Sequence, residues 1–163
     1  MSDLWRNLPL SARERVDESG VGGGWGAELD AVRAAAQAAL AGHPDAAAAD
    51  EFASAVASPR PGRRGRARRV GLRELDRAVY AYLALCARIG ATPHVPERAA
   101  GAVALGRAAA APTPIRAVIA GHTLRATDAE WSFGRGPVLE DSTPELLAFL
   151  AGQSLRAPRP AAG

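Results

Sequence analysis

The side chains that could hold a metal ion or transfer a proton are few in this 163-residue chain. Three histidines are present, His43, His94 and His122, and the sequence places each of them in a turn or loop. A protein metal site brings several ligands together, often from positions four apart on one helix face. None of these histidines shares a helix face with another ligand type, so we predict that they are ordinary surface residues. No catalytic or metal-ligating residue is assigned from the sequence.

The single cysteine and a group of carboxylates also have structural interpretations. Cys86 falls within the apolar stripe of a predicted helix, where a thiol packs as a small hydrophobic group. Four carboxylates lie close together near the C-terminus, and paired carboxylates can do acid–base work. No nucleophile or metal ligand accompanies them, so we interpret them as turn and capping residues: Asp128, Glu130, Glu140 and Asp141.

A run of arginines is the one feature that could bind an anion. All 20 basic residues are arginine, and the candidate anion-binding residues are Arg60, Arg63, Arg64, Arg66, Arg68 and Arg69. Such a cluster attracts nucleic acid in a salt-dependent way. Proline and glycine interrupt it, however, and neither interleaved aromatics nor a helix-turn-helix or zinc pattern accompanies it. We predict a solvated linker at 59–69, with contact to nucleic acid or an acidic partner as the alternative.

Composition limits both the core and the compartment. Hydrophobic residues make up 48% of the chain, but many are alanines, and aromatics are only 5%. Burial is worth roughly 25 cal/mol per Å² of apolar surface, so an alanine-rich core is thinly stabilised, and support from a second copy or a protein partner is favoured. A lone cysteine forms no internal disulfide, and the N-terminal residues lack a signal-peptide pattern. No apolar run reaches about 18 residues. We therefore expect a cytoplasmic protein with no membrane partner.

Helical periodicity dominates the region 27–111. Apolar residues recur three and four apart from Leu72 to Ile89, and Gly90 follows as a stop. Tyr80 and Tyr82 flank this stripe. A short helix capped by Ser11 is also expected within the N-terminal segment. The predicted helices of the region 27–111 are 27–41, 45–58, 72–89 and 96–110.

After Pro114 the pattern changes from helical to alternating. We predict a first strand over 115–120, a tight turn at Gly121-His122, and a returning strand over 123–127. Two further strands, a capping box of Ser142 with Glu145, and a helix ended by Gly152 follow. Trp131 is expected to anchor the core of this region, with its ring against Leu146 or Leu150. The predicted further strands are 131–133 and 138–140.

These elements predict an α+β fold: a mainly helical N-terminal part with a small C-terminal antiparallel sheet and a closing helix. Residues 1–26 form a flexible N-terminal segment in this interpretation. Residues 27–111 form a helical region that the arginine-rich linker interrupts. Residues 112–152 form a small β-hairpin and helix unit, and 153–163 are a disordered tail.

The run TLRATDAEWSFGRGPV at 123–138, followed by PELLAFLAG at 144–152, resembles the C-terminal portion of the mycothiol-dependent maleylpyruvate isomerase family. The typical stretch of that family reads approximately lrATDxDWsxGxGPxVxGpxxxLLLxLaGR. The preceding helix and its connection are also similar, so the resemblance covers about 72–152. Asp141 departs from the pattern, which has a glycine there, and Gln153 replaces its terminal arginine.

The resemblance implies an N-terminal DinB-like helical bundle that holds a divalent metal, which in turn activates mycothiol. Family members take their ligands from a helix that starts with Gly-Trp and from a Glu-x-x-x-His pair on a later helix. Here Gly24-Trp25 is present, but the matching ligand position falls near Arg33. The later pair falls near Arg77 and Ala81. Sliding the alignment by one residue gives instead the pair Asp76 and Tyr80.

The resemblance without these ligands predicts a shortened, metal-free relative that acts as a non-catalytic or accessory protein. No cofactor is predicted under this interpretation. One alternative is an active metal- and mycothiol-dependent isomerase or transferase with ligands at other positions. A second alternative is a nucleic-acid-associated protein that uses the arginine-rich linker. The partner, whether a second copy or another protein, is not specified by the sequence.

Overall fold

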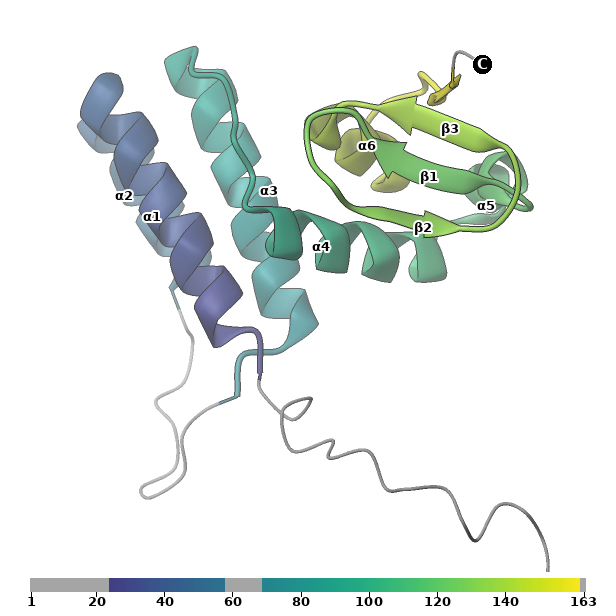
Figure 1. The fold of residues 1–163 in the computed structure, drawn as a ribbon. Helices are drawn as coiled ribbons and strands as arrows, with labels where there is room; N and C mark the ends of the chain where they lie inside the picture. The colour runs from purple at the N-terminus through teal and green to yellow at the C-terminus, as the bar shows by residue number, and fades with distance from the viewer. Residues whose placement is uncertain (1–23, 58–68, 162–163) are drawn as a thin grey trace, which may run out of the picture.

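Alanine-rich helices build the first half of an α+β fold, as the sequence predicts (Figure 1). The computed structural model describes residues 24–57 and 69–161. Of the predicted N-terminal segment 1–26, only 24–26 are described, so the short helix expected after Ser11 lies outside the described residues. The helices of this half are α1 (Gly26–Gly42), α2 (Ala46–Val56), α3 (Leu72–Ile89) and α4 (Glu97–Ala110).

Local signals explain where these helices begin and end. Asp45 caps α2 by accepting a hydrogen bond from the Ala48 backbone nitrogen at 2.9 Å, because the first amides of a helix have no partner within it. Gly90 ends α3 in the left-handed conformation, with φ of 67°. Each boundary lies within about two residues of the sequence prediction, the usual spread at a fraying helix end.

The buried face of α3 is broader than the predicted stripe. Tyr82 is buried, although the sequence predicts it at the flank, while Leu83 is only half-buried. The reason is that α1, α2 and α4 all pack against α3, so that more than one side of the helix is covered. The buried residues of α3 are Leu75, Ala78, Val79, Tyr82, Leu85 and Cys86.

Helices α1 and α3 run side by side in the same direction, and α2 packs against α3 and runs in the opposite direction (Figure 1). At the N-terminal ends, the Trp25 backbone nitrogen donates to the Val70 carbonyl oxygen at 3.0 Å. The C-terminal ends of α1 and α3 therefore also lie together. Within the described ranges, none of the helices combines the length and apolar character needed to cross a membrane.

The C-terminal unit consists of a short helix, a four-stranded sheet and a closing helix. The sheet order is β2-β1-β3-β4, and β1 pairs antiparallel with β2 but parallel with β3. The sheet is thus mixed, and the prediction of an antiparallel sheet is wrong. The bounds are α5 (Thr113–Ile119), β1 (Thr123–Ala126), β2 (Ser132–Gly134), β3 (Val138–Asp141), α6 (Thr143–Leu150) and β4 (Arg159–Pro160).

The mixed order arises because the link from β2 to β3 passes over the start of β1. Instead of adding β3 beside β2, the chain crosses and places β3 on the other side of β1 (Figure 1). The Thr123 backbone nitrogen donates to the Pro137 carbonyl oxygen at 2.9 Å. The Thr123 hydroxyl donates to the Gly136 carbonyl oxygen at 3.2 Å. The start of β1 is therefore tied to the segment that crosses it.

The first predicted strand, 115–120, is a helix instead. Pro114 lies in the first turn of α5, where proline is favoured because its nitrogen needs no partner. Ile115 is buried and Ile119 is half-buried, and residues four apart lie on one helix face. An alternation of apolar and polar residues over only six positions therefore does not distinguish a strand from a short helix. Gly121 still turns the chain with φ of 74°, but between α5 and β1.

The predicted disordered tail is partly ordered. β4 pairs antiparallel with β3 through Leu139 and Glu140, and Pro158 is buried. The Arg156 guanidinium lies 3.6 Å from the Asp141 carboxylate. Only 162–163 of this tail lie outside the described residues. The correction follows from β3, whose free edge offers backbone partners that no local pattern in the tail reveals.

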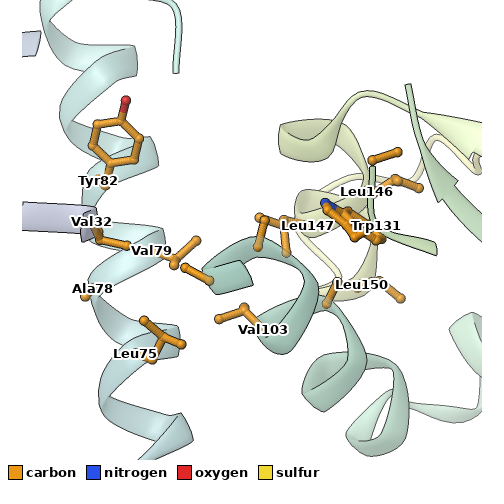
Figure 2. Packing of buried hydrophobic residues seen from close by; sticks show 14 of the residues in the cluster. Val32, Leu75, Ala78, Val79, Tyr82, Val103, Trp131, Leu146, Leu147 and Leu150 are labelled. Carbon is orange, nitrogen blue, oxygen red and sulfur yellow. The ribbon is translucent and has the colours of Figure 1, made fainter. Parts of the chain in front are cut away.

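Helix α4 joins the two halves of the fold through a continuous core. Figure 2 shows Val103 of α4 between Val79 of α3 and the leucines of α6. Alanines occupy most of the remaining buried positions of α4, which allows the helices to approach closely. The alanine-rich core expected from the composition therefore runs continuously through both halves of the fold.

Candidate functional site

Three side chains from α3 and α4 form the tightest polar cluster in the described part of the chain. The Arg107 guanidinium donates from Nε to Asp76 Oδ1 and from its terminal nitrogen Nη2 to Asp76 Oδ2, each at 2.6 Å. Its central carbon lies 4.8 Å from the centre of the Tyr80 ring. The Tyr80 hydroxyl then donates to the Leu147 carbonyl oxygen at 2.8 Å. This Asp76–Tyr80–Arg107 cluster ties α3 to α4 and to α6.

The cluster occupies one of the two pairs of positions where the resemblance would place a metal pair. Both carboxylate oxygens of Asp76 are engaged by Arg107, in the two-pronged geometry that guanidinium and carboxylate groups favour. The hydrogen bonds to Asp76 raise the pKa of the Arg107 guanidinium, so its charge persists at all ordinary pH values. A neighbouring open hollow of about 350 Å³ is lined by both residues. The cluster suits structural linkage, and it presents no free carboxylate to a cation.

Arg107 is the member that sequence reasoning misses. It lies on α4, 31 positions after Asp76, and an arginine in an alanine-rich helix carries no distinguishing local signal. The spacing of Asp76 and Tyr80 on α3 is visible in the sequence, because residues four apart share a face. Their partner is determined only by how α4 packs on α3.

The two tyrosines of the chain are expected to resist ionisation in the folded protein. Burial raises the pKa of Tyr80 to about 12, and the nearby Arg107 charge offsets this only in part. Burial also raises the pKa of Tyr82. A tyrosine in the unfolded chain has a pKa near 10. The raised pKa of Tyr80 therefore contributes fully to the free energy of unfolding below about pH 10, and this contribution is lost as pH rises through about 12. Spectrophotometric titration should show no tyrosinate near pH 10 until the protein is unfolded.

Tyr80→Phe provides the control for this titration. It should remove one of the two late-titrating groups and flatten the loss of stability between about pH 10 and pH 12. That loss is on the order of 1–2 kcal/mol in the unmodified protein, because solvent still reaches part of the ring. A tyrosine that titrates normally in the folded protein would show that the ring of Tyr80 is not held as described.

The histidines divide into a pair and a single residue. His43 and His94 line one hollow of about 400 Å³, which also contains Tyr82. The His94 backbone nitrogen donates to the Tyr82 hydroxyl at 3.0 Å. His122 lies elsewhere, with Nδ1 3.0 Å from the Ala120 carbonyl oxygen. His43 and His94 thus border the same hollow, although no pattern in the sequence connects them. Across 24–57 and 69–161, no group of three or more His, Cys, Asp and Glu side chains could hold a metal ion.

The carboxylates near the C-terminus serve the fold. Asp128 Oδ1 accepts hydrogen bonds from the Thr143 backbone nitrogen and hydroxyl, each at 2.7 Å, and so caps α6. The predicted capping box is wrong, because Ser142 makes no side-chain cap bond and Asp128 occupies that role from 15 residues away. Glu140 pairs with Arg125 on the neighbouring strand. Asp128 is therefore a capping residue, as interpreted, whereas Glu140 is a strand residue that pairs across the sheet.

Cys86 and the arginine cluster add no site to this part of the chain. Cys86 is buried, and burial raises the pKa of its thiol, which keeps the sulfur protonated and unreactive. Of the candidate anion-binding arginines, Arg69 is exposed. The others lie outside the described residues: Arg60, Arg63, Arg64, Arg66 and Arg68.

Comparisons of the chain with family models, with curated proteins and with solved structures find no match in any of the three. Two features bear on the function: the resemblance in the sequence and the geometry of the Asp76–Tyr80–Arg107 cluster.

Proposed function

We propose that this chain is a cytoplasmic, non-catalytic accessory or binding protein related to the mycothiol-dependent maleylpyruvate isomerase family. Two independent lines support the proposal. The sequence carries the Thr-Asp-x-x-Trp-Ser-x-Gly-x-Gly-Pro core of the family between Thr127 and Pro137. The positions corresponding to the metal pair of the family hold residues engaged in packing and ion pairing.

The single observation that carries the proposal is the two-pronged ion pair of Asp76 and Arg107. A divalent cation at Asp76 would have to displace a guanidinium and would then lie beside its positive charge. Two like charges at contact distance repel strongly, even at the effective dielectric constant of a protein surface. The other alignment offers Arg77, an exposed cation, and Ala81, which has no ligand atom. Neither pair of positions suits metal chemistry.

The same cluster suits a protein whose role is to hold a shape. Arg107 spans α3 and α4, and Tyr80 reaches the backbone of α6, so the helical half and the C-terminal unit are fixed relative to each other. A fixed arrangement of two halves gives a partner a preformed surface, which lowers the entropy lost on binding. We therefore assign a structural role to the ion pair of Asp76 and Arg107.

A combined activity and stability measurement tests the proposal. With mycothiol and Zn²⁺ supplied, the purified protein should not isomerise maleylpyruvate above the uncatalysed rate. Asp76→Asn should lower the free energy of unfolding by about 1–2 kcal/mol, because Arg107 loses a charged partner. Chemical denaturation followed by circular dichroism measures the second effect.

Asp30→Asn is the matched control for the stability measurement. Asp30 forms an ion pair with Arg33 on α1, at 3.1 Å, but its side chain is 74% exposed. Exposed ion pairs contribute little, so this variant should stay within about 0.5 kcal/mol of the unmodified protein. Turnover that disappears in Asp76→Asn or Tyr80→Phe would contradict the proposal, since it would place these side chains in catalysis.

A further inference from the structure

An open groove lies between α1 and α2, the two helices that flank α3. Each of them packs along α3, whereas the two make at most a marginal contact with each other. The space between them has a volume of about 330 Å³ and is lined by one side of each helix. We call this space the α1–α2 groove.

The lining of the α1–α2 groove is almost entirely apolar. Its larger side chains are Leu40, Phe52 and Val56, and Leu40 and Phe52 are only half-buried. Four alanines complete the apolar part, and the polar lining residues are Arg33 and Gln37, both on α1. Removing apolar surface from water is favourable, so this lining favours an apolar occupant.

The described surface of a second copy offers little to fill the groove. Among residues 24–57 and 69–161, the large hydrophobic side chains that are exposed lie on three different segments: Leu105 on α4, Val118 on α5 and Leu155 in the tail. A second copy would therefore present single apolar side chains, whereas the groove extends along two helices.

The N-terminal residues of the same chain contain a continuous apolar strip. Four large apolar residues fall within positions 4–10: Leu4, Trp5, Leu8 and Leu10. Residues 1–23 precede the described part of the chain, which begins at Gly24 and enters α1 two positions later. The strip is therefore joined directly to one of the two helices that form the groove.

The length of the intervening chain allows the strip to reach the groove. Residues 11–23 connect the strip to Gly24, and 13 extended residues span at most about 45 Å. Arg33 and Leu40, which line the groove, lie seven and fourteen positions after Gly26 on α1. At 1.5 Å per residue these positions are only about 10 and 21 Å along the helix, well within that span.

We propose that the strip 4–10 docks within the same molecule in the α1–α2 groove. The docked strip covers Leu40 and Phe52, and Trp5 supplies the largest apolar area of the contact. The groove uses none of the residues of the Asp76–Tyr80–Arg107 cluster. The proposal therefore stands or falls independently of the proposed function.

Paramagnetic relaxation enhancement in the full chain tests the docking. A nitroxide attached at Ser11→Cys, next to the strip, should cause loss of the amide signals of Ala49 and Ala53, which line the groove. The amide signal of Leu139 in β3 should remain. Cys86 is buried and its thiol pKa is raised, so the label attaches at position 11.

Two substitutions and a matched control establish where the strip docks. Ala53→Glu places a charge in the groove, and Trp5→Ser shortens the strip, so each should restore the lost signals. Ser54→Glu is the matched control, because Ser54 is exposed on the same helix but does not line the groove. This variant should lose the signals as the unmodified protein does.

A mixed sample distinguishes docking within one molecule from docking between two. Isotope-labelled protein without nitroxide, mixed with nitroxide-labelled protein without isotope, should keep its Ala49 and Ala53 signals. Loss of these signals in the mixture would place the strip in the groove of a second copy and overturn the proposal. Retention of the signals in the singly labelled chain, or their continued loss in both Ala53→Glu and Trp5→Ser, would overturn it as well.

Discussion

Gly136→Ala is expected to destabilise the protein by about 3–4 kcal/mol, more than most single substitutions. Gly136 lies in the segment that crosses the start of β1, and its φ of 110° is a conformation that side chains rarely adopt. A Cβ atom at this position would collide with the carbonyl oxygen of Gly121. The oxygen belongs to the backbone and the Cβ is fixed directly to it, so neither atom can move without opening the crossing. Urea denaturation followed by circular dichroism measures the loss.

Gly121→Ala separates the collision from the cost of positive φ alone. Gly121 has φ of 74°, and a Cβ added there would meet no atom within 4 Å. Its substitution should therefore cost only about 1–2 kcal/mol, the usual penalty for a side chain in the left-handed region. Equal losses in the two variants would show that the crossing is not as tight as the structure indicates.

Trp131→Ala is expected to cost about 3–5 kcal/mol, because it removes the largest side chain from the core of the C-terminal unit. Trp131 is only 8% exposed, and Figure 2 shows it among Leu146, Leu147 and Leu150 of α6. Its ring also stacks on Phe133, with centroids 5.9 Å apart. The other buried side chains of this unit are mainly aliphatic, with Phe149 as a further ring, so few neighbours can fill the cavity. Thermal and chemical denaturation both measure this loss.

Trp131→Phe distinguishes the ring from its polar nitrogen. Trp131 Nε1 is buried and has no hydrogen-bond partner among the described residues, which is unfavourable for a polar group. Phenylalanine removes this nitrogen and keeps an aromatic ring, so the variant should lose well under half of what Trp131→Ala loses. A loss in Trp131→Phe as large as in Trp131→Ala would mean that an unseen contact of Nε1 matters.

The link that crosses the start of β1 and the burial of Trp131 explain several residues of the C-terminal motif. Trp131 fills the space between the sheet, α6 and α4. The contact with α4 is close, because a Cβ added at Gly101 would lie 3.2 Å from the Cβ of Trp131. Gly134, the last residue of β2, and Gly136 let the chain pass over β1 with positive φ at both positions. Trp131 and the two glycines of this segment therefore have a structural explanation.

Helix α3 makes two separate groups of polar contacts. Asp76 and Tyr80 lie on the side of α3 that faces α4 and α6, where ion pairing connects the halves. Tyr82 lies nearer the C-terminal end and positions the loop that carries His94.

The sequence alone predicts most of the helices and strands whose boundaries depend on neighbouring residues along the chain. The apolar spacing from Leu72 to Ile89, the cap at Asp45 and the stop at Gly90 each act within one or two turns, so they predict α2 and α3 within about two residues. Alternation and glycine-rich turns likewise predict β1, β2 and β3 closely. The short segment 113–119 escapes this reasoning, since its few residues fit either a strand or a helix.

Features that join distant parts of the chain were decided only by the tertiary structure. Arg107 reaches Asp76 across 31 positions, and Asp128 caps α6 across 15, because packing brings their backbones together. The parallel pairing of β1 with β3 depends on the direction of a crossing that no local pattern encodes. His43 and His94 border one hollow because α1 and α3 run in the same direction. Local sequence thus determined the elements, while the long-range burial of a thin alanine-rich core determined which side chains meet.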